Sequence, residues 1–493
     1  MATQTFSTDM PVPAAKLSDW HFAPGAFERL SPPWQDVTLV HQDRPIVDGS
    51  KAEVVLKKGP IRSRWLVRHT DVRPGHSFRD EQVSGPFAAW RHRHEFGPGE
   101  DVSSPAGSRV GEHRGGGTES RRTEDRPTES RLAESRLTDE VTYRLPLEPL
   151  SRWIAGGFVE GELRRLFRHR HELTRRDLER HSQFPDTKLR VAITGGTGLV
   201  GSQLAAYLST AGHEVSLLER RGGSSGPPWA GSIEWSIREE TIDAAALEGV
   251  DAVVHLAGAP IAVRWTDDAK RAIRDSRVNG TSFLARTLAG LDRPPKVVVS
   301  TSAVGFYGRG IDDQLRVESS PAGTGFLADV AQEWEAAADP LRERGIRVVH
   351  PRLGVVLSPK GGALAKMLPA FQFGAGGPIG SGRQWFPWIS LEDVLGALEF
   401  AIHRDDLHGP VNFVAPECVR QAEFASVLGK VLRRPSFAPL PAFVVRTLFG
   451  GMADEALLSG VPVVPQSLEE SGFTFQHRSL EAALRDELGR WTD

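Results

Sequence analysis

The chain has 493 residues, which is too many for one hydrophobic core and predicts two or three domains. Its 60 basic and 63 acidic side chains leave a net charge of −3, so no global electric field attracts nucleic acid or an anionic membrane surface. The single cysteine, Cys418, excludes an internal disulfide and a thiolate zinc site, as is typical of proteins in a reducing compartment.

The beginning of the chain carries no export signal. Residues 1–20 lack a basic segment followed by an apolar core. No stretch approaches the roughly 20 apolar residues that a membrane helix requires. We therefore expect a soluble, cytoplasmic protein with a small-molecule substrate and with neither a nucleic-acid nor a membrane partner.

The first domain is predicted over residues 1–181. Short strand patterns separated by proline and glycine predict an antiparallel sheet, and they occupy 37–41, 52–58, 62–70 and 88–96. Residues 101–139 consist mostly of Ser, Arg, Glu, Thr and Gly and have almost nothing to bury, which predicts a disordered insertion. Apolar residues near helical spacing over 157–181 then predict a long amphipathic helix that closes the domain.

A second domain is predicted from residue 188 onward. Apolar strand patterns alternate with helical patterns, and the strands occupy 189–194, 213–219, 251–258, 296–303 and 347–357. Continuous apolar runs separated by helices are typical of a parallel sheet buried on both faces. We expect an α/β fold with a Rossmann-type doubly wound sheet over 188–410. Helix patterns and proline-rich turns over 411–493 predict a small C-terminal lobe.

A glycine-rich turn follows the first strand of this domain, in "RVAITGGTGLVGSQLA" at residues 190–205. Its glycines fit both G-x-G-x-x-G and G-x-x-G-x-x-G, spacings that let a backbone turn tightly and approach a pyrophosphate at a helix N-terminus. The pattern lies between a strand and a helix, so we interpret it as a dinucleotide site rather than an ordinary turn. The residues predicted to bind the cofactor here are Gly195, Thr197, Gly198, Leu199, Val200 and Gly201.

The second strand of the domain ends in Glu219, which Arg220 and Arg221 follow directly. An acidic residue about 20 positions after the glycines binds the ribose hydroxyl of NAD, whereas arginines there pair with the 2′-phosphate of NADP. We predict that Arg220 and Arg221 bind the cofactor and that NADP is preferred. Glu219 keeps NAD as the alternative, and a solvated basic turn is the interpretation without a cofactor contact.

Four segments, "TGGTGLVG", "HLAGAPI", "STSAVGFYG" and "HPRLGVVL", resemble in this order those of extended short-chain dehydrogenases/reductases. More narrowly, "RWTDDAKRAIRDSRVNGT", "GFLADVAQEWE" and "GAGGPIGSGRQWFPWISLEDV" resemble the atypical epimerase-like subgroup, whose members are often named nucleoside-diphosphate-sugar epimerases or cell-division inhibitors. The resemblance covers residues 188–493. It implies an NADP-dependent oxidoreductase or epimerase-like enzyme in which Leu256, Ala257 and Gly258 line the adenine and ribose side of the cofactor.

The first domain is similar to a second family. Its segments "PGAFERLSPPW", "GPFAAWRHRHEF" and "YRLPL" resemble the START-like fold of polyketide cyclases/dehydrases. The resemblance implies an α+β helix-grip domain, in which a sheet wraps a long helix around a cavity for an apolar ligand. His92 and His94 share one face of a strand, as two metal ligands can. Because no third ligand is apparent nearby in the sequence, we predict no metal site.

The usual catalytic residues of the dehydrogenase family are absent. In the family, a tyrosine and a lysine four residues later pass the proton that accompanies hydride transfer. At that place this chain has Phe326 and Val330 or, shifted by one residue, Leu327 and Ala331. The missing pair leaves open a second interpretation, a sensor or regulatory protein that binds NADP without turning anything over.

Two catalytic candidates remain in "STSAVGFYG". Ser302 matches the family's serine and is predicted to polarise a substrate carbonyl, and Tyr307 is either a substitute acid or a tyrosine that only packs. Arg277 and Arg352 either hold an anionic group together or form buried ion pairs. The resemblance also implies that the loop within 376–394, with Trp385 and Trp388, lies beside the nicotinamide, or else that these tryptophans pack in the core.

Overall fold

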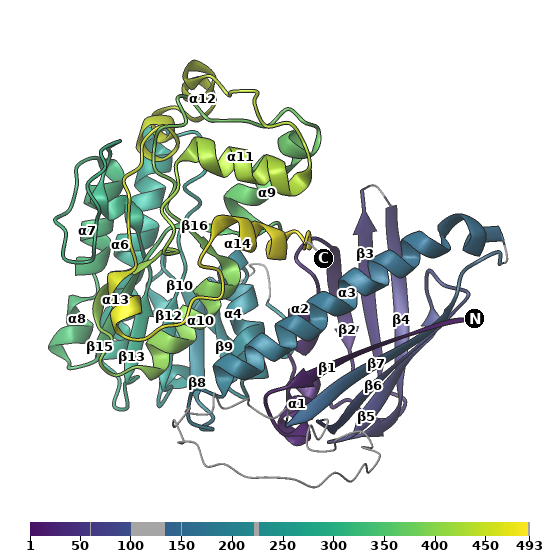
Figure 1. Ribbon diagram of the computed structural model, residues 1–493. Helices are drawn as coiled ribbons and strands as arrows, with labels where there is room; N and C mark the ends of the chain where they lie inside the picture. The colour runs from purple at the N-terminus through teal and green to yellow at the C-terminus, as the bar shows by residue number, and fades with distance from the viewer. Residues whose placement is uncertain (60, 100–133, 149, 221–225, 492–493) are drawn as a thin grey trace, which may run out of the picture. The chain divides into compact units, whose positions relative to one another are not determined.

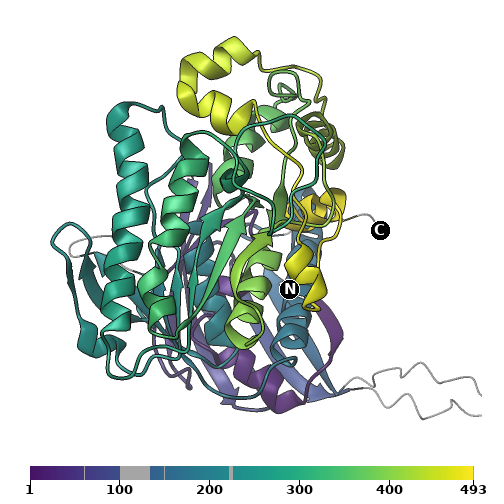
Figure 2. The same cartoon turned by 90° about the vertical axis from the view of Figure 1, so that its left-hand side faces the viewer.

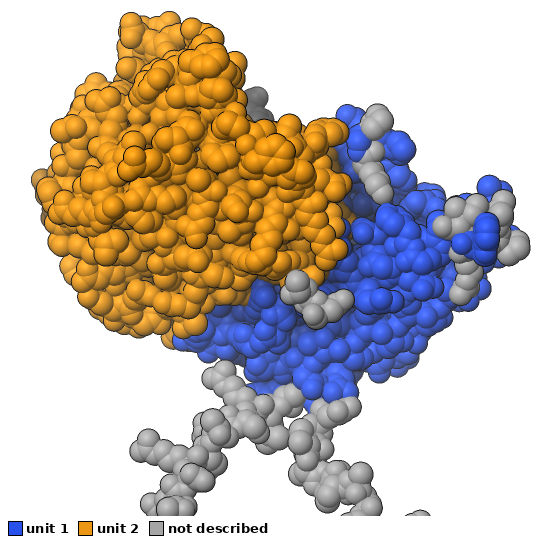
Figure 3. Space-filling model, turned by 45° about the horizontal axis from the view of Figure 1, so that its top comes forward, with its two compact units in different colours: residues 1–22, 37–183 blue, residues 23–36, 184–493 orange. Residues whose placement is uncertain are grey.

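A computed structural model of the chain describes residues 1–59, 61–99, 134–148, 150–220 and 226–491. It divides into two compact units, which Figure 3 shows in different colours. Unit 1 comprises residues 1–22 and 37–183, and unit 2 comprises residues 23–36 and 184–493. The division after residue 183 falls between the predicted domains, which end at residue 181 and begin at residue 188. Residues 23–36 belong to unit 2 and not to the first domain as predicted.

Unit 1 is built on an antiparallel sheet of seven described strands in the order β1-β7-β6-β5-β4-β3-β2 (Figure 1). The strands are β1 Ala2–Met10, β2 Asp36–Gln42, β3 Lys51–Lys58, β4 Ile61–Arg73, β5 Ser77–Ser84, β6 Ala89–Pro98 and β7 Ser135–Arg144. The helices α1 (Ala14–Phe22) and α3 (Leu150–His181) complete the unit. Buried and exposed residues alternate along β6 and β7, so one face of the sheet packs inward. The predicted antiparallel sheet and long helix are confirmed.

The structure corrects the predicted insertion at its C-terminal end. Strand β7 begins at Ser135, whereas residues 101–133 lie outside the described residues. The strand starts there because Leu137 and Val141 alternate with polar residues and bury their side chains on the inner face of the sheet. Strand β7 also pairs with β1, from Ser135 to Tyr143. The polar residues between the apolar ones made this strand look like part of the insertion.

Unit 2 contains a mainly parallel sheet of nine described strands. They are β8 Arg190–Thr194, β9 Glu214–Arg220, β10 Gly231–Ser236, β11 Thr241–Ile242, β12 Ala252–His255, β13 Val297–Ser300, β14 Ser302–Ala303, β15 Arg347–Leu353 and β18 Gly409–Phe413. The parallel strands follow the order β10-β9-β8-β12-β13-β15-β18. This order reverses direction between β8 and β12, which is where ligands bind in open α/β sheets. The predicted Rossmann-type fold is confirmed.

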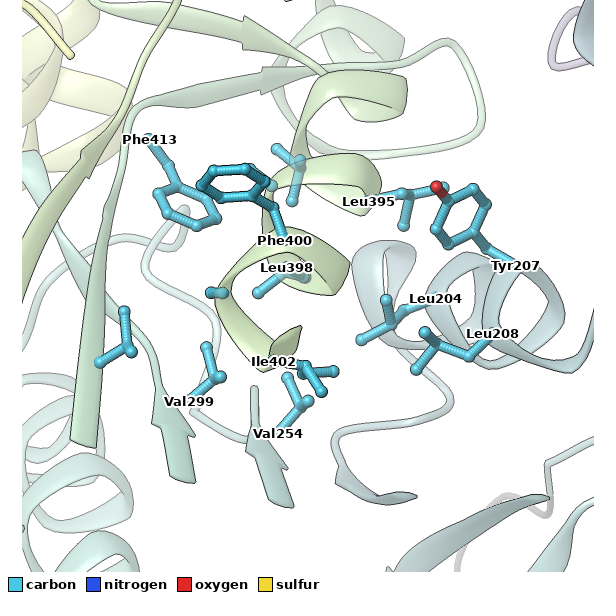
Figure 4. Packing of buried hydrophobic residues seen from close by; sticks show 14 of the residues in the cluster. Leu204, Tyr207, Leu208, Val254, Val299, Leu395, Leu398, Phe400, Ile402 and Phe413 are labelled. Carbon is cyan, nitrogen blue, oxygen red and sulfur yellow. The ribbon is translucent and has the colours of Figure 1, made fainter. Parts of the chain in front are cut away.

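Helices cover both faces of this sheet (Figure 2). Helices α4 and α10 pack on one face, and α5, α6 and α8 pack on the other. The α-helices of unit 2 from residue 184 onward are α4 Leu199–Thr210, α5 Ala244–Leu247, α6 Asp267–Ala289, α7 Phe326–Ala336, α8 Asp339–Glu343, α9 Gly362–Gln372, α10 Leu391–His403, α11 Gln421–Leu432, α12 Ala442–Phe449, α13 Gln466–Glu470 and α14 Leu480–Glu487. Figure 4 shows side chains of α4 and α10 packed with Val254 of β12 and Val299 of β13. The short strands β16 (Val355–Leu357) and β17 (Trp388–Ser390) pair separately. Among the described helices, none is long and apolar enough to span a membrane.

Two boundaries within unit 2 differ from the prediction. The predicted start of the C-terminal lobe, residue 411, falls inside β18, which pairs with β15 in the central sheet, and residues 184–493 form one compact unit. The helix α2 (Ala26–Leu30) packs on α4, and its Arg29 forms a two-point ion pair with Glu392 of α10 at 3.1 and 2.7 Å. A Cβ on Gly25 would lie 2.5 Å from Cα of Ala206, so this contact requires glycine.

Candidate cofactor and substrate site

The glycine turn is shaped by steric contacts that leave no room for side chains. Gly195 follows β8 with a φ of +69°, and a Cβ there would lie 2.9 Å from the carbonyl carbon of Leu256, just after β12. A Cβ on Gly201 would lie 2.3 Å from the carbonyl oxygen of Gly195. The amide of Gly198 donates to that same oxygen over 2.9 Å. The turn is therefore closed by a hydrogen bond between its own residues and lies in close contact with the residue that follows β12.

The N-terminus of α4 is available to an anion. Gly198 is the N-cap residue and offers no side-chain cap, and the first turn of the helix holds no acidic residue. The first N–H groups of a helix have no partner within the helix, and the helix dipole places partial positive charge there. Thr197 and Gly198 are exposed, and Leu199 and Val200 are partly so. This arrangement suits a pyrophosphate.

Thr194 joins the ends of β8 and β12 below the turn. Its hydroxyl accepts hydrogen bonds from the amides of Leu256 and Ala257 at 3.0 and 3.1 Å and lies 2.7 Å from Nδ1 of His255. Burial, reinforced by the charge of Arg277, lowers the pKa of His255 to about 4 and keeps the ring neutral. The structure thus brings the predicted Leu256–Gly258 segment next to Gly195, as a shared cofactor site requires.

At the end of β9, the acidic Glu219 and the basic Arg220 differ in their contacts. The carboxylate of Glu219 accepts a hydrogen bond from the amide of Gly226 and another from the hydroxyl of Ser232 at 2.7 Å. It is therefore engaged within the protein. Arg220, the last residue of β9, is exposed. The predicted Arg221 lies outside the described residues.

Unit 2 contains a cavity of about 240 Å³ beside the sheet. Its lining is mostly apolar and comes from elements far apart in the sequence, including Ile261, Val304, Leu327, Val330, Ala331, Trp334, Val355, Trp385, Phe386 and Val461. Arg277 and Glu455 are the ionisable side chains among the residues that line it. The cavity can therefore take a small compound with an apolar body and a polar group.

Helix α7 carries the residues of both alignments for the missing catalytic pair, and Val330 of the first alignment lines the cavity. Leu327 and Ala331 both line the cavity. The ring of Phe326 instead packs edge-on against Trp265, with 5.0 Å between the ring centroids. Because apolar side chains stand where the family has its tyrosine and lysine, no proton passes through this pair.

The two ionisable groups of the cavity wall are held in place. Both Nη1 contacts of Arg277, to the carbonyl oxygens of Ala259 and Ile273, measure 3.1 Å. Burial lowers the pKa of Arg277 to about 10, which leaves it protonated at neutral pH. Oε1 of Glu455 lies 3.3 Å from Nε of Arg309. No motif in the sequence pointed to Glu455, which reaches the cavity from the π-helical segment Ala453–Leu457.

Ser302 and Tyr307 belong to a buried polar network, and neither is among the lining residues of the cavity. The hydroxyl of Ser302 donates to Oε1 of Glu335 over 2.7 Å. Tyr307 donates to Oδ1 of Asn412 over 2.7 Å and accepts from Nη1 of Arg352 over 3.0 Å. Burial raises the pKa of Tyr307. This geometry favours the packing alternative for Tyr307 and commits the hydroxyl of Ser302 to Glu335.

Of the remaining candidate residues, one lines the cavity and the others are buried elsewhere in the unit. Arg352 forms an ion pair with Glu335 at 2.8 and 2.9 Å, so it does not hold an anion together with Arg277. Trp385 lines the cavity and has the guanidinium of Arg420 3.8 Å above its ring. Trp388 is buried in the core, where its Nε1 donates to the carbonyl of Glu417.

Comparisons with known proteins show which families the chain resembles. Residues 191–414 match the NAD dependent epimerase/dehydratase family, residues 440–487 a domain of unknown function, and residues 10–169 the polyketide cyclase / dehydrase and lipid transport family. An epimerase family protein of Mycobacterium bovis is 44% identical over 295 residues, which are 60% of this chain and 96% of that protein. The chain belongs to the epimerase family. The part of unit 2 from residue 184 onward is therefore called the epimerase domain below, and unit 1 the cyclase domain.

Other members of the epimerase family extend the comparison. The human epimerase family protein SDR39U1 is 37% identical over 301 residues, covering 60% of this chain and 99% of that protein. Its crystal structure with NADPH has a TM-score of 0.56 and 36% identity, covering 62% of this chain and all of that one. A nucleoside-diphosphate sugar epimerase from Corynebacterium glutamicum has a TM-score of 0.73 and 30% identity, covering 99% of this chain and 90% of that one. Both predicted family resemblances are confirmed.

Proposed function

We propose that the epimerase domain binds NADP(H) at the β8–α4 turn and catalyses hydride transfer to or from a small substrate in the cavity. The observation that carries the proposal is the uncapped N-terminus of α4, placed at the reversal of strand order behind a turn that admits only glycine at Gly195 and Gly201. The nicotinamide, when bound, supplies or accepts the hydride.

NADP is the proposed form of the cofactor. Glu219 is already engaged by Gly226 and Ser232, which removes the carboxylate that would grip the ribose hydroxyl of NAD. Arg220 is exposed at the end of the same strand and is suited to a 2′-phosphate. The NADPH in the structure of the human family member supports this choice.

The cavity wall defines the proposed substrate class. Apolar walls leave the hydroxyl groups of an unprotected sugar without partners, which is costly when they are buried. We therefore propose a carbonyl or alcohol compound with an apolar body. Arg277 would donate to its oxygen and stabilise negative charge there, and Glu455 would exchange the proton that accompanies hydride transfer.

The replacement Arg220→Glu tests the cofactor assignment. We expect the affinity for NADPH to fall by about tenfold or more while the affinity for NADH changes little, because a charge-assisted contact to the phosphate is worth roughly 1.5–3 kcal/mol. Quenching of tryptophan fluorescence in titrations with each nucleotide measures both affinities. Arg238→Glu is the matched control, since Arg238 is an exposed arginine in the turn between β10 and β11. An equal loss for both nucleotides refutes the assignment to the 2′-phosphate.

A sensor that binds NADP without turnover is the second candidate, and the apolar Leu327 and Ala331 on the cavity wall favour it. Mixing the protein with deuterium-labelled NADPH and a panel of apolar ketones and aldehydes distinguishes the two. The proposed enzyme transfers deuterium to product, and Glu455→Gln slows this transfer without changing the NADPH affinity. Tight NADPH binding without deuterium transfer to any member of the panel favours the sensor.

For the cyclase domain we propose an apolar ligand on the inner face of the sheet. The support is the family match together with a cluster of buried apolar side chains shared by the sheet and α3, which includes Trp90, Val141, Tyr143, Leu163 and Phe167. The ring of Phe167 also stacks on Phe6 of β1 with 4.6 Å between centroids.

A further inference from the structure

Imidazoles and carboxylates gather on the inner face of the cyclase-domain sheet, beside its apolar cluster. His92 and His94 occupy alternate, buried positions of β6. Asp80 lies directly across from His92 on β5, and Asp139 lies directly across from His94 on β7. Three neighbouring strands therefore direct these four side chains toward one another in the interior of the domain.

Three ligand-type atoms in this group, one each from Asp80, His92 and His94, lie within 4.8 Å of one another. Oδ2 of Asp80 lies 3.5 Å from Nε2 of His94 and 4.0 Å from Nδ1 of His92. Both distances exceed that of an ordinary hydrogen bond. The first is close to the separation of about 3.4 Å between ligand atoms that each lie about 2.0–2.1 Å from a tetrahedral metal, and the second is longer.

The other nitrogen of each ring faces Asp139. Nε2 of His92 lies 2.9 Å and Nδ1 of His94 lies 2.7 Å from Oδ1 of this carboxylate. Asp139 is in turn held through Oδ2 by Nε2 of His171 at 2.7 Å. A carboxylate behind each histidine, which fixes its orientation and basicity, is the arrangement that accompanies metal-binding histidines.

The carboxylate of Asp80 is also held by a supporting residue. Oδ1 of Asp80 lies 2.6 Å from Nδ1 of His69, a buried residue of β4, while Oδ2 faces the two histidines. Each of the three ligand-type side chains thus uses one polar atom to contact a supporting residue and turns its second toward the other two. A hydrogen-bonded cluster without an ion would instead be expected to bring these second atoms into hydrogen-bond distance.

We propose that the cyclase domain binds one divalent first-row transition metal through Nδ1 of His92, Nε2 of His94 and Oδ2 of Asp80, with Asp139 orienting both imidazoles. Two imidazoles and a carboxylate suit Zn²⁺, Co²⁺, Ni²⁺ or Fe²⁺ better than Mg²⁺ or Ca²⁺. Three protein ligands leave a position for an oxygen of a small ligand, as in catalytic rather than structural zinc sites. The sequence had shown only the two histidines, because Asp80 is supplied by a different strand.

Zinc titration of the full chain after treatment with a chelator tests this site. We expect one Zn²⁺ per chain by calorimetry and by metal analysis after dialysis. His92→Gln and His94→Gln are each expected to lower the affinity by about 100-fold or more, and Asp139→Asn by about 10–100-fold. His41→Gln is the matched control, because His41 is an exposed histidine of a strand in the same sheet. It is expected to bind like the unmodified protein.

Two further measurements keep the test independent of folding defects in the variants. Zn²⁺ should raise the melting temperature of the unmodified chain, and Co²⁺ should give visible absorption typical of nitrogen and oxygen ligands. Both effects are expected to be lost in His94→Gln, whose far-ultraviolet circular dichroism and NADPH binding report on folding. The proposal is overturned if the unmodified chain retains no Zn²⁺, if His92→Gln and His94→Gln bind it as tightly as the unmodified chain, or if His41→Gln loses it equally.

Discussion

Replacing Gly195 with alanine is expected to weaken NADPH binding by about 100-fold, which corresponds to about 3 kcal/mol. The new Cβ would lie 2.9 Å from the carbonyl carbon of Leu256 and 3.0 Å from the amide nitrogen of Ala257. Both are backbone atoms of the segment that follows β12, so the turn must move away from it. The φ of +69° adds backbone strain that glycine avoids. Fluorescence titration with NADPH measures the loss.

Gly212→Ala is the matched control for this replacement. Gly212 also has a positive φ, +86°, and lies just after α4, but an added Cβ would meet nothing within 4 Å. This variant is expected to lose only about 1 kcal/mol of stability and to bind NADPH normally. If Gly195→Ala binds NADPH as the unmodified protein does, or if both variants lose binding equally, the turn does not hold the cofactor.

Replacing Glu335 with glutamine is expected to lower the free energy of unfolding of unit 2 by about 3 kcal/mol or more. Arg352 is 3% exposed and depends on the Glu335 carboxylate for two of its hydrogen bonds. The variant keeps the shape of the side chain but leaves a guanidinium buried without its counter-charge, and it disturbs the contact of Ser302 with the same group. Urea denaturation, followed through the transition that NADPH stabilises, measures the change.

Glu333→Gln on the same helix is the control, because it removes a carboxylate charge from an exposed ion pair instead of a buried one. Glu333 pairs with Arg274, but both side chains are substantially exposed, at 39% and 53%. Exposed pairs typically contribute about 1 kcal/mol or less, so this variant is expected to differ little from the unmodified protein. Equal destabilisation by the two replacements would show that burial of the Glu335–Arg352 ion pair does not determine its contribution to stability.

The strands and the glycine turn of unit 2 could be predicted because their signals are local. Continuous apolar runs such as Val297–Ser300 identify parallel strands that are buried on both faces. The glycine spacing identifies the turn because Gly198 and Gly201 both approach the backbone of Gly195, a few residues away. In contrast, β1 and β7 of unit 1 consist mostly of polar residues, and the pairing between them spans more than a hundred residues. Pairing over that distance leaves no local pattern.

The side chains that form the cavity and the histidine group could likewise not be assigned from the sequence alone. The sequence offered both Trp385 and Trp388 for the site, but only the folded chain shows that Trp385 lines the cavity and Trp388 packs in the core. Glu455 and Asp80 carry no motif, because they meet their neighbours through tertiary contacts alone. Residues brought together by different strands and loops can be assigned to a site only when the fold is known.

Calorimetric titration of the full chain with NADPH, NADP⁺, NADH and NAD⁺ tests the central claim most directly, because every functional proposal for the epimerase domain depends on a diphosphate bound at the N-terminus of α4. The predicted result is one site per chain, with both phosphorylated nucleotides bound more tightly than their unphosphorylated counterparts. Absence of binding heat with all four nucleotides at several temperatures, together with no change in tryptophan fluorescence, would contradict it.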